Sequence, residues 1–234
     1  MCDKLFHMQA VILCAGKGTR MGDLTKNLPK PLLEINSKSL IEYKLEKLPS
    51  YITEVILVIG YLGEKIKDKF GSEYLGKKIT YVEDMELTGT AKALWQAKNI
   101  LKSRFIVMMG DDIYDSQAIS ECAKNDFSLV CINADRETSG SRVVLDENGQ
   151  PKEFQTHLLY IKNFQDGGKI FTGLYSMTDE IFNYQPVKMD LSDEWSLPKT
   201  FLQVRNKHNI KIVEANQWVQ ITKPEDLNQN IKIQ

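Results

Sequence analysis

The sequence predicts an α/β fold with a Rossmann-like, mixed but mostly parallel sheet flanked by helices. Two observations carry this prediction. Short, continuous apolar runs alternate with segments of helical periodicity, which is typical of strand–helix–strand units with a buried sheet. Two polar, glycine-containing loops also follow apolar runs directly. Because ligands bind beyond the carboxyl ends of parallel strands, both loops are expected at one edge of the sheet.

The N-terminal half contains the clearest elements. Ser39 is a suitable N-cap for a helix that carries Leu40, Ile41, Leu45 and Leu48 on one face. Residues 15–30 are rich in Gly, Thr and Lys and are expected to form a long loop. We expect strands over residues 8–16, 54–60, 78–82, 105–109 and 128–132, and helices over 40–48, 63–70, 91–101 and 117–124.

The second half has a different pattern. Residues 142–145 and 151–154, joined by a polar turn, predict a hairpin. Further strands are expected over 169–177, 210–214 and 218–221, with helices over 197–207 and 223–231. No linker or repeat interrupts the chain, so we expect one domain over residues 1–234.

Composition excludes several classes of protein. The 234 residues have a net charge of −1, so no overall basic field favours nucleic acid. No apolar run approaches the roughly 20 residues that span a bilayer, so no membrane partner is expected. Cys2, Cys14, Cys122 and Cys131 form no C-x-x-C pair. These features indicate a cytoplasmic protein in which the cysteines act as small apolar side chains, and they leave the oligomeric state open.

The strongest functional signal is the loop Ala15-Gly16-Lys17-Gly18-Thr19-Arg20, together with Lys30. Glycines let the backbone approach a ligand closely, and consecutive amides can form an anion-binding nest. Arg20 offers a planar fork and Lys30 a point charge for phosphate oxygens. The loop lacks the last glycine of a dinucleotide fingerprint and has no Walker sequence. A purely structural glycine turn is the alternative.

Carboxylates at the end of a later strand indicate a cation. Asp111 and Asp112 follow Gly110 at the end of the run 105–109. Magnesium usually binds one or two carboxylates plus substrate phosphates, so this turn is a candidate Mg²⁺ site. A solvated acidic turn is the alternative.

At this point the sequence resembles the sugar-phosphate nucleotidyltransferase family. The segments that carry the resemblance are Val11–Met21, Leu28–Leu33, Leu40–Tyr43, Gly60-Tyr61, Gly89–Ala91, Gly110-Asp111 and Thr172–Tyr175. The resemblance is strong to about residue 115 and weaker afterwards. It implies the nucleotide-diphospho-sugar transferase type of fold, with residues 8–125 binding the NTP and residues 126–234 the acceptor. Residues 1–7 precede the family's usual start and are expected to be an extension.

The resemblance also implies roles for individual residues. Arg20 and Lys30 are expected to be catalytic, and Gly173 to contact the acceptor. Nucleotide binding is expected from Ala15, Gly16, Lys17, Gly18, Thr19, Glu83, Gly89 and Thr90, with Glu86 as the alternative to Glu83.

Two positions depart from the family pattern. Gln220 replaces the aspartate expected as a second metal ligand beside Asp111, so Asp190 or Asp193 is an alternative source of the charge. Thr156-His157-Leu158 stands where many relatives carry E-K-P. Both changes weaken the inference to any particular sugar.

The sequence thus predicts a Mg²⁺-dependent nucleotidyltransferase. It would transfer NMP from an NTP to a phosphorylated small molecule, with a sugar 1-phosphate as the first expectation, and release pyrophosphate. A cytidylyltransferase acting on phosphocholine or inositol phosphate is one alternative. A nucleotide-binding regulatory protein weakened in catalysis at Gln220, or a scaffold with a structural glycine loop, are the others.

Overall fold

A mixed sheet forms the centre of the molecule in the computed structural model, which describes residues 8–134, 140–155, 168–190 and 192–228. Ten strands of the described chain belong to this sheet. They are β1 (Met8–Cys14), β4 (Ile52–Ile59), β5 (Glu73–Tyr74), β6 (Lys77–Glu83), β7 (Arg104–Met109), β9 (Ser128–Ala134), β10 (Ser141–Leu145), β11 (Pro151–Gln155), β12 (Gly168–Thr178) and β15 (Lys211–Glu214).

The parallel core of the sheet is β6–β4–β1–β7, as the alternating apolar runs predicted. Leu13 pairs with Met109 and Cys14 with Ile59, so the carboxyl ends of β1, β4 and β7 are level with one another. The loops that follow these strands therefore open at one edge of the sheet, where the sequence placed the candidate site.

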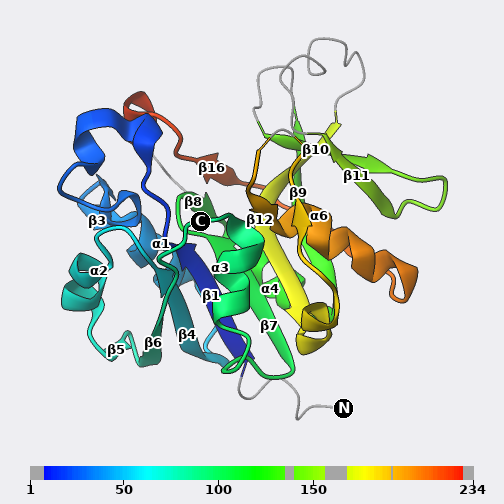
Figure 1. The fold of residues 1–234 in the computed structure, drawn as a ribbon, viewed down its shortest axis with the longest axis horizontal. Helices are drawn as coiled ribbons and strands as arrows, with labels where there is room; N and C mark the ends of the chain where they lie inside the picture. The colour runs from blue at the N-terminus through cyan, green and yellow to red at the C-terminus, as the bar shows by residue number, and fades with distance from the viewer. Residues whose placement is uncertain (1–7, 135–139, 156–167, 191, 229–234) are drawn as a thin grey trace.

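The second half of the chain extends the same sheet in the antiparallel sense. The long strand β12 pairs with both β7 and β9, and the predicted hairpin β10–β11 is joined to it through β10. Because β12 is antiparallel to β7, its N-terminal part lies beside the carboxyl end of β7. Figure 1 shows most of the second half of the chain on the right of the central strands, whereas residues 224–228, in red, return to the N-terminal half at the upper left.

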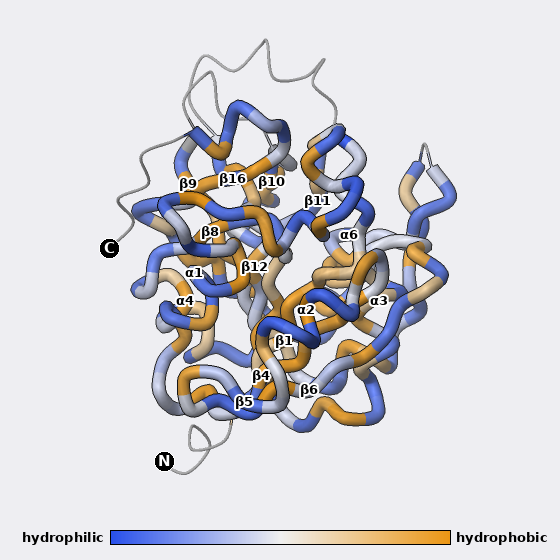
Figure 2. The backbone as a smooth tube through the Cα atoms, turned by 90° about the vertical axis from the view of Figure 1, so that its left-hand side faces the viewer, coloured by the Kyte–Doolittle hydropathy of each residue, from blue (hydrophilic) through white to orange (hydrophobic). Residues whose placement is uncertain are grey.

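Helices cover both faces of the sheet. One face packs against α1 (Leu40–Lys47), α2 (Gly63–Phe70) and α4 (Ser116–Ala123), and the other against α3 (Thr90–Gln96) and α6 (Leu197–Leu202). Strand β4 shows the consequence, since Val55 and Leu57 join the first core while Ile56 and Val58 join the second. Being buried on both faces explains why these strands are continuously apolar, as Figure 2 shows along β1 and β4.

Short elements complete the described fold. Two-stranded pairs are formed by β2 (Glu34–Ile35) with β3 (Lys38–Ser39), β8 (Asp112–Tyr114) with β16 (Trp218–Gln220), and β13 (Val187–Lys188) with β14 (Trp195–Ser196). The 3₁₀ helices are η2 (Thr19–Thr25), η3 (Lys30–Leu32), η4 (Asp179–Asn183), η5 (Gln203–Asn206) and η6 (Pro224–Asn228).

Several expected element boundaries were wrong. The segment 15–30 is not a plain loop, because it contains η2. The helix expected over 91–101 is α3, which ends at Gln96 where the amide of Ala97 bonds three residues back to Leu94. The helix expected over 197–207 splits into α6 and η5, again through tighter i to i−3 bonds. The closing helix is the short η6, and the rest of its expected range lies outside the described residues.

Among the described residues, no helix combines the length and the apolar character needed to cross a membrane.

Glu42 stabilises the start of α1. Ser39 and Glu42 form a reciprocal capping box, and the Glu42 carboxylate also accepts from Lys69 at 2.7 Å and from the Tyr74 hydroxyl at 3.0 Å. Burial alone would raise the pKa of this carboxyl. The bonds from Lys69, Ser39 and Tyr74 outweigh burial and hold the pKa at about 2, below its usual 4.5.

We expect Glu42→Gln to lower stability at neutral pH by on the order of 1 kcal/mol after solvent screening, or about 2–4 °C in Tm. The folded-state pKa is depressed, so the contribution is present above pH 4.5 and lost as the pH falls toward 2. The gap in Tm between variant and wild type should therefore close on acidification. Glu46→Gln, which removes a more exposed pair with Lys38 near the same helix, is the control. A gap that is constant with pH would contradict this account.

Candidate active site

A cavity of about 400 Å³ opens at the carboxyl ends of β1, β6 and β7. Its lining brings together most of the residues that the sequence singled out. These are Ala15, Gly16, Gly18, Thr19, Arg20, Lys30, Gly89, Thr90 and Asp111. Residues from four separate segments therefore meet at one place, which the alternative of an isolated structural glycine turn does not explain.

The loop after β1 is shaped around Lys30. Gly18 is left-handed, with φ +63°, and a Cβ added there would lie 2.8 Å from the Cβ of Lys30. Gly16 differs, because a Cβ there would meet nothing within 4 Å. The loop thus packs on Lys30 at Gly18 and leaves its backbone accessible at Gly16, as close approach of a ligand requires.

Lys30 and Asp111 form an ion pair within the cavity. The Lys30 ammonium lies 2.5 Å from Asp111 Oδ2, and the lysine side chain is 8% exposed against 34% for the aspartate. Lys30 begins η3 and Asp111 follows β7, so the pair joins two distant segments. A cation and an oxygen ligand are thereby presented side by side at the end of the sheet.

A buried lysine that sequence reasoning missed supports this region. The Lys44 ammonium donates to the carbonyl oxygens of Leu40 and Gly110, each at 3.0 Å. Burial lowers its pKa to about 8, although the nearby Cys14, Asp112 and Asp111 act in the opposite direction. The sequence contained a signal for a buried lysine, because Lys44 interrupts the apolar face of the helix four residues after Leu40.

A second cavity of about 590 Å³ adjoins the first, since Arg20, Thr90 and Met109 line both. Gly173 and Gln220 line this second cavity. Gly173 has φ +83°, and a Cβ there would lie 2.5 Å from Cγ of Met109. Glycine is therefore required where β12 passes the end of β7, and this close passage joins the two cavities.

Asp112 belongs to the acidic turn that the sequence offered as a candidate Mg²⁺ site, although the resemblance assigned the ligand role to Asp111 alone. It is 4% exposed and lines the second cavity, but its Oδ1 has no hydrogen-bond partner. Burial raises its pKa well above the usual value, and the neighbouring Asp111 carboxylate raises it further. The Trp218 indole N–H lowers this pKa without reaching hydrogen-bonding geometry, and it also lacks a partner.

The oxygen donors at this edge fit a hard divalent cation. They are the carboxylates of Asp111 and Asp112 and the amide of Gln220, and a buried carboxylate oxygen without a partner is a ligand atom still to be satisfied. The described residues contain no group of three or more His, Cys, Asp and Glu placed to hold a metal. A cation here would therefore need substrate phosphates to complete its coordination, as Mg²⁺ commonly does.

Other predicted residues lie elsewhere. Glu83 is exposed and pairs with Lys67 at 2.8 Å, whereas the buried Asp84 beside it lines the cavity. Asp190 and Asp193 are exposed and pair with lysines rather than lining either cavity. Lys17 is exposed next to the cavity lining, and Thr156-His157-Leu158 lies outside the described residues.

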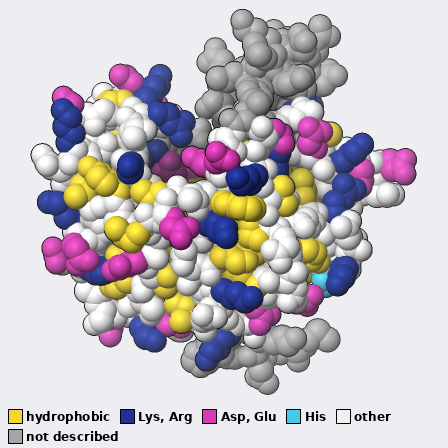
Figure 3. Space-filling model, viewed as in Figure 1, with side chains coloured by type: hydrophobic (Ala, Val, Ile, Leu, Met, Phe, Trp, Pro, Cys, Tyr) yellow, Lys and Arg dark blue, Asp and Glu magenta, His cyan; other side chains and the backbone are white. Residues whose placement is uncertain are grey.

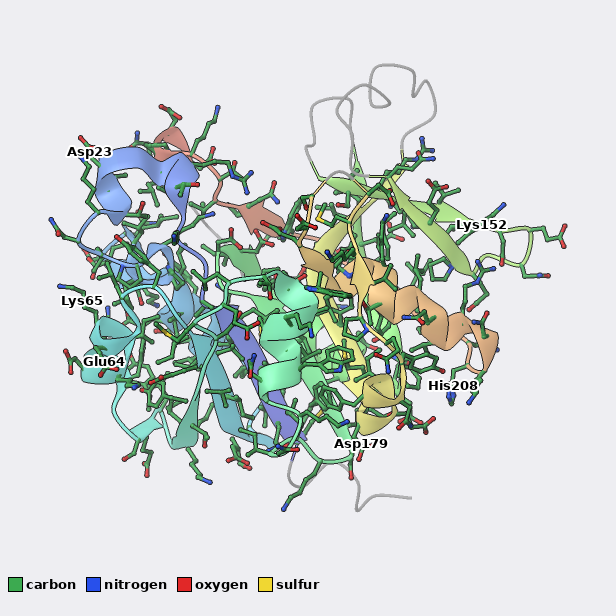
Figure 4. All side chains as sticks on the ribbon, viewed as in Figure 1. Asp23, Glu64, Lys65, Lys152, Asp179 and His208 are labelled. Atoms are coloured by element: carbon green, nitrogen blue, oxygen red, sulfur yellow. The ribbon has the colours of Figure 1, made fainter. Side chains whose placement is uncertain are left out.

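Charges away from the cavities are distributed without a dominant sign. Figure 3 shows basic and acidic side chains interspersed over the visible face, with apolar patches between them. Figure 4 places several charged side chains at the periphery, namely Asp23, Glu64, Lys65, Lys152, Asp179 and His208.

Comparison with known proteins agrees with this geometry. Residues 9–145 match the family described as nucleotidyl transferase. A D-glycero-alpha-D-manno-heptose 1-phosphate guanylyltransferase of Campylobacter jejuni is 32% identical over 223 residues, covering 94% of this chain and 96% of the relative. A UTP–glucose-1-phosphate uridylyltransferase of Haloferax volcanii is 27% identical, covering 94% and 93%. This chain spans about half the length of a bifunctional GlmU protein of Methanococcus aeolicus, with 28% identity and 53% of that relative covered.

The fold is also shared with solved structures. An inositol-1-phosphate CTP transferase from T. maritima superposes with a TM-score of 0.73 at 21% identity, covering 95% of this chain and 92% of that one. At this identity the likeness concerns the fold alone. The match over residues 9–145 and the 32% identical relative show that the chain belongs to the nucleotidyl transferase family.

Proposed function

We propose that the protein is a sugar-1-phosphate nucleotidyltransferase that converts an NTP and a sugar 1-phosphate into an NDP-sugar and pyrophosphate. The observation that carries this proposal is the cavity in which the glycine loop, Arg20 and the Lys30–Asp111 pair meet. The adjoining second cavity supplies room for an acceptor beside the nucleotide. Family membership and the printed activities of the relatives support it.

The proposed reaction is a single in-line displacement. An oxygen of the acceptor phosphate forms a bond to the α-phosphorus, and the bond from that phosphorus to the pyrophosphate oxygen breaks. The acceptor phosphate is ionised at neutral pH, so no general base is required. Catalysis then consists of positioning and charge neutralisation.

The residues of the chain divide this work. The loop amides near Gly16 and the Arg20 guanidinium hold the β- and γ-phosphates, and Lys30 bridges the α-phosphate and the acceptor phosphate. Gly173 allows the acceptor to approach β12 closely. Asp111 and Gln220 would hold a Mg²⁺ ion, which when bound neutralises phosphate charge. We further propose that residues 8–125 bind the nucleotide and residues 126–234 the acceptor.

For the nucleobase we propose guanine, recognised by Asp84 instead of the expected Glu83. Asp84 lines the cavity, and its carboxylate accepts a hydrogen bond from the backbone amide of Leu87 at 3.4 Å. A carboxylate has about four lone-pair sites, so acceptor capacity remains for a ligand. Guanine presents two adjacent N–H donors that one carboxylate can accept together, and the 32% identical relative is named a guanylyltransferase.

The alternatives stay testable. Fold similarity to an inositol-1-phosphate CTP transferase keeps a cytidylyltransferase as the second candidate. A regulatory protein weakened at Gln220 would bind nucleotide without releasing pyrophosphate. The buried free cysteines Cys14, Cys122 and Cys131 support a cytoplasmic location, since burial raises the pKa of each thiol to about 12 and keeps it unreactive.

Lys30→Met should reduce kcat/KM for pyrophosphate release by on the order of 10²–10³, because it removes a preorganised charge while keeping the length of the side chain. Arg20→Gln should act in the same direction. Lys65→Met, at the periphery on α2, is the control for loss of a lysine. The measurement is coupled pyrophosphate release, and a wild-type rate in Lys30→Met would remove Lys30 from the mechanism.

Pyrophosphate release should be fastest with GTP when ATP, GTP, CTP, UTP and dTTP are crossed with sugar 1-phosphates, phosphocholine and inositol 1-phosphate. Asp84→Asn should then reduce kcat/KM for GTP by about 5- to 150-fold, the worth of a bidentate base contact. If Glu83→Gln, and not Asp84→Asn, shows this loss of kcat/KM for GTP, then Glu83 is the residue that recognises the base. Release with CTP and inositol 1-phosphate alone would favour the second candidate.

A further inference from the structure

We propose that Asp112 is a ligand of the divalent cation in this site and supplies the negative charge that Gln220 does not. The proposal rests on the proposed function, because the cation is the one expected to accompany the nucleotide. It assigns the charge to a residue on β8 rather than to one on β16.

Asp112 and Gln220 are direct neighbours across the strand pair. They are register partners in the antiparallel pairing of β8 with β16. Side chains of directly opposed residues lie on the same face, with Cβ atoms roughly 4.5–5.5 Å apart. A carboxylate on Asp112 can therefore serve nearly the same point in space as a carboxylate at position 220.

The Asp112 carboxylate still has an unused ligand atom. The residue is 4% exposed, and Oδ1 has no hydrogen-bond partner in the described part of the chain. The Tyr114 hydroxyl reaches only Oδ2, at the long distance of 3.5 Å. A buried carboxyl oxygen without a hydrogen-bond partner is costly, and a bound cation would give this oxygen a partner.

Nearby ammonium groups are already engaged by other atoms. The Lys30 ammonium forms an ion pair with Asp111 Oδ2 at 2.5 Å, and the Lys44 ammonium donates to the carbonyls of Leu40 and Gly110. Both lysines lower the pKa of Asp112, so they act on it electrostatically, but neither lies within bonding distance of the unpartnered Oδ1. The Trp218 indole N–H also lowers the pKa of Asp112 but forms no hydrogen bond within the described structure. The second cavity, which Asp112 and Trp218 both line, is where a ligand for this oxygen would enter.

Asp190 and Asp193, which the sequence offered as alternative sources of the charge missing at Gln220, are poorly placed to bind a cation in this site. Asp190 lies 2.5 Å from the Lys199 ammonium and Asp193 lies 2.8 Å from Lys188, and their side chains are 82% and 100% exposed. Neither lines the cavities. Asp112 is buried at the edge of the site, and its oxygen atoms are the hard donors that Mg²⁺ prefers.

A structural role for Asp112 makes the opposite prediction about stability. If the residue only held Tyr114, its loss would destabilise the protein without any cation. If it is a cation ligand, Asp112→Asn removes a buried carboxyl group whose Oδ1 is unsatisfied among the described residues, and should leave Tm without added metal unchanged or higher. Asparagine has nearly the same shape, so packing against Gly173 is retained.

The test is Mn²⁺ binding, followed by the electron paramagnetic resonance signal of free Mn²⁺. Full-length protein is titrated alone and with the nucleotide that most raises its Tm. Asp112→Asn should raise the Mn²⁺ Kd at least tenfold, as should Asp111→Asn. The double variant Asp112→Asn/Gln220→Asp should recover most of the affinity, because the charge returns to the facing position. Asp179→Asn, at the periphery in Figure 4, is the matched control and should bind as wild type.

Each outcome is decisive. The proposal is overturned if Asp112→Asn binds Mn²⁺ with wild-type affinity, or if the double variant recovers none of the lost Mn²⁺ affinity. It is also overturned if the metal-free Tm of Asp112→Asn falls by several degrees. Wild-type protein that binds no Mn²⁺ in either titration overturns it as well. If nucleotides still raise the wild-type Tm in these cases, the proposed function survives. If no nucleotide raises it, the proposed function itself has failed.

Discussion

The hydrogen bond from the buried Lys44 ammonium to the Gly110 carbonyl is the constraint on which the rest of the site depends. Gly110 is the turn between β7 and the two adjacent aspartates, and Lys44 reaches it from α1 on one face of the sheet. The same ammonium also donates to the Leu40 carbonyl at 3.0 Å, so it is held in place by both buried hydrogen bonds. This fixes the acidic turn to the framework before any ligand arrives, and a fixed charge needs no reorganisation during catalysis.

Charged side chains lie at the carboxyl edge of the parallel strands. The level ends of β1, β4 and β7 leave a common edge, and the chain puts Lys30 and Asp111 there as a pair. The antiparallel strand β12 then runs back past the same edge and brings the second half of the chain to it. One sheet thus carries both cavities, and strands of both halves of the chain line them.

Much of this arrangement could be predicted from the sequence, for identifiable reasons. Continuous apolar runs and Gly-rich loops are local signals, so the parallel core was confirmed, and Ala15, Gly16, Gly18, Thr19 and Arg20 line the first cavity while Lys17 does not. Spacing did not show that Asp84, rather than Glu83, lines the cavity, because adjacent residues at a strand end point to different sides. The sequence placed Asp112 in the acidic turn but could not show its unpartnered oxygen among the described residues or its pairing with Gln220, a contact between segments far apart in the chain. Helix ends were wrong at Gln96 and Leu202, where the change to i to i−3 bonding has no strong local signature.

The close packing of Gly18 on Lys30 has a consequence for how this sequence can change over time. The two positions belong to one segment of the chain, and their atoms leave no room for a methyl group between them. A larger residue at position 18 would displace the lysine. A sequence that exchanges the glycine alone would therefore begin with a misplaced charge.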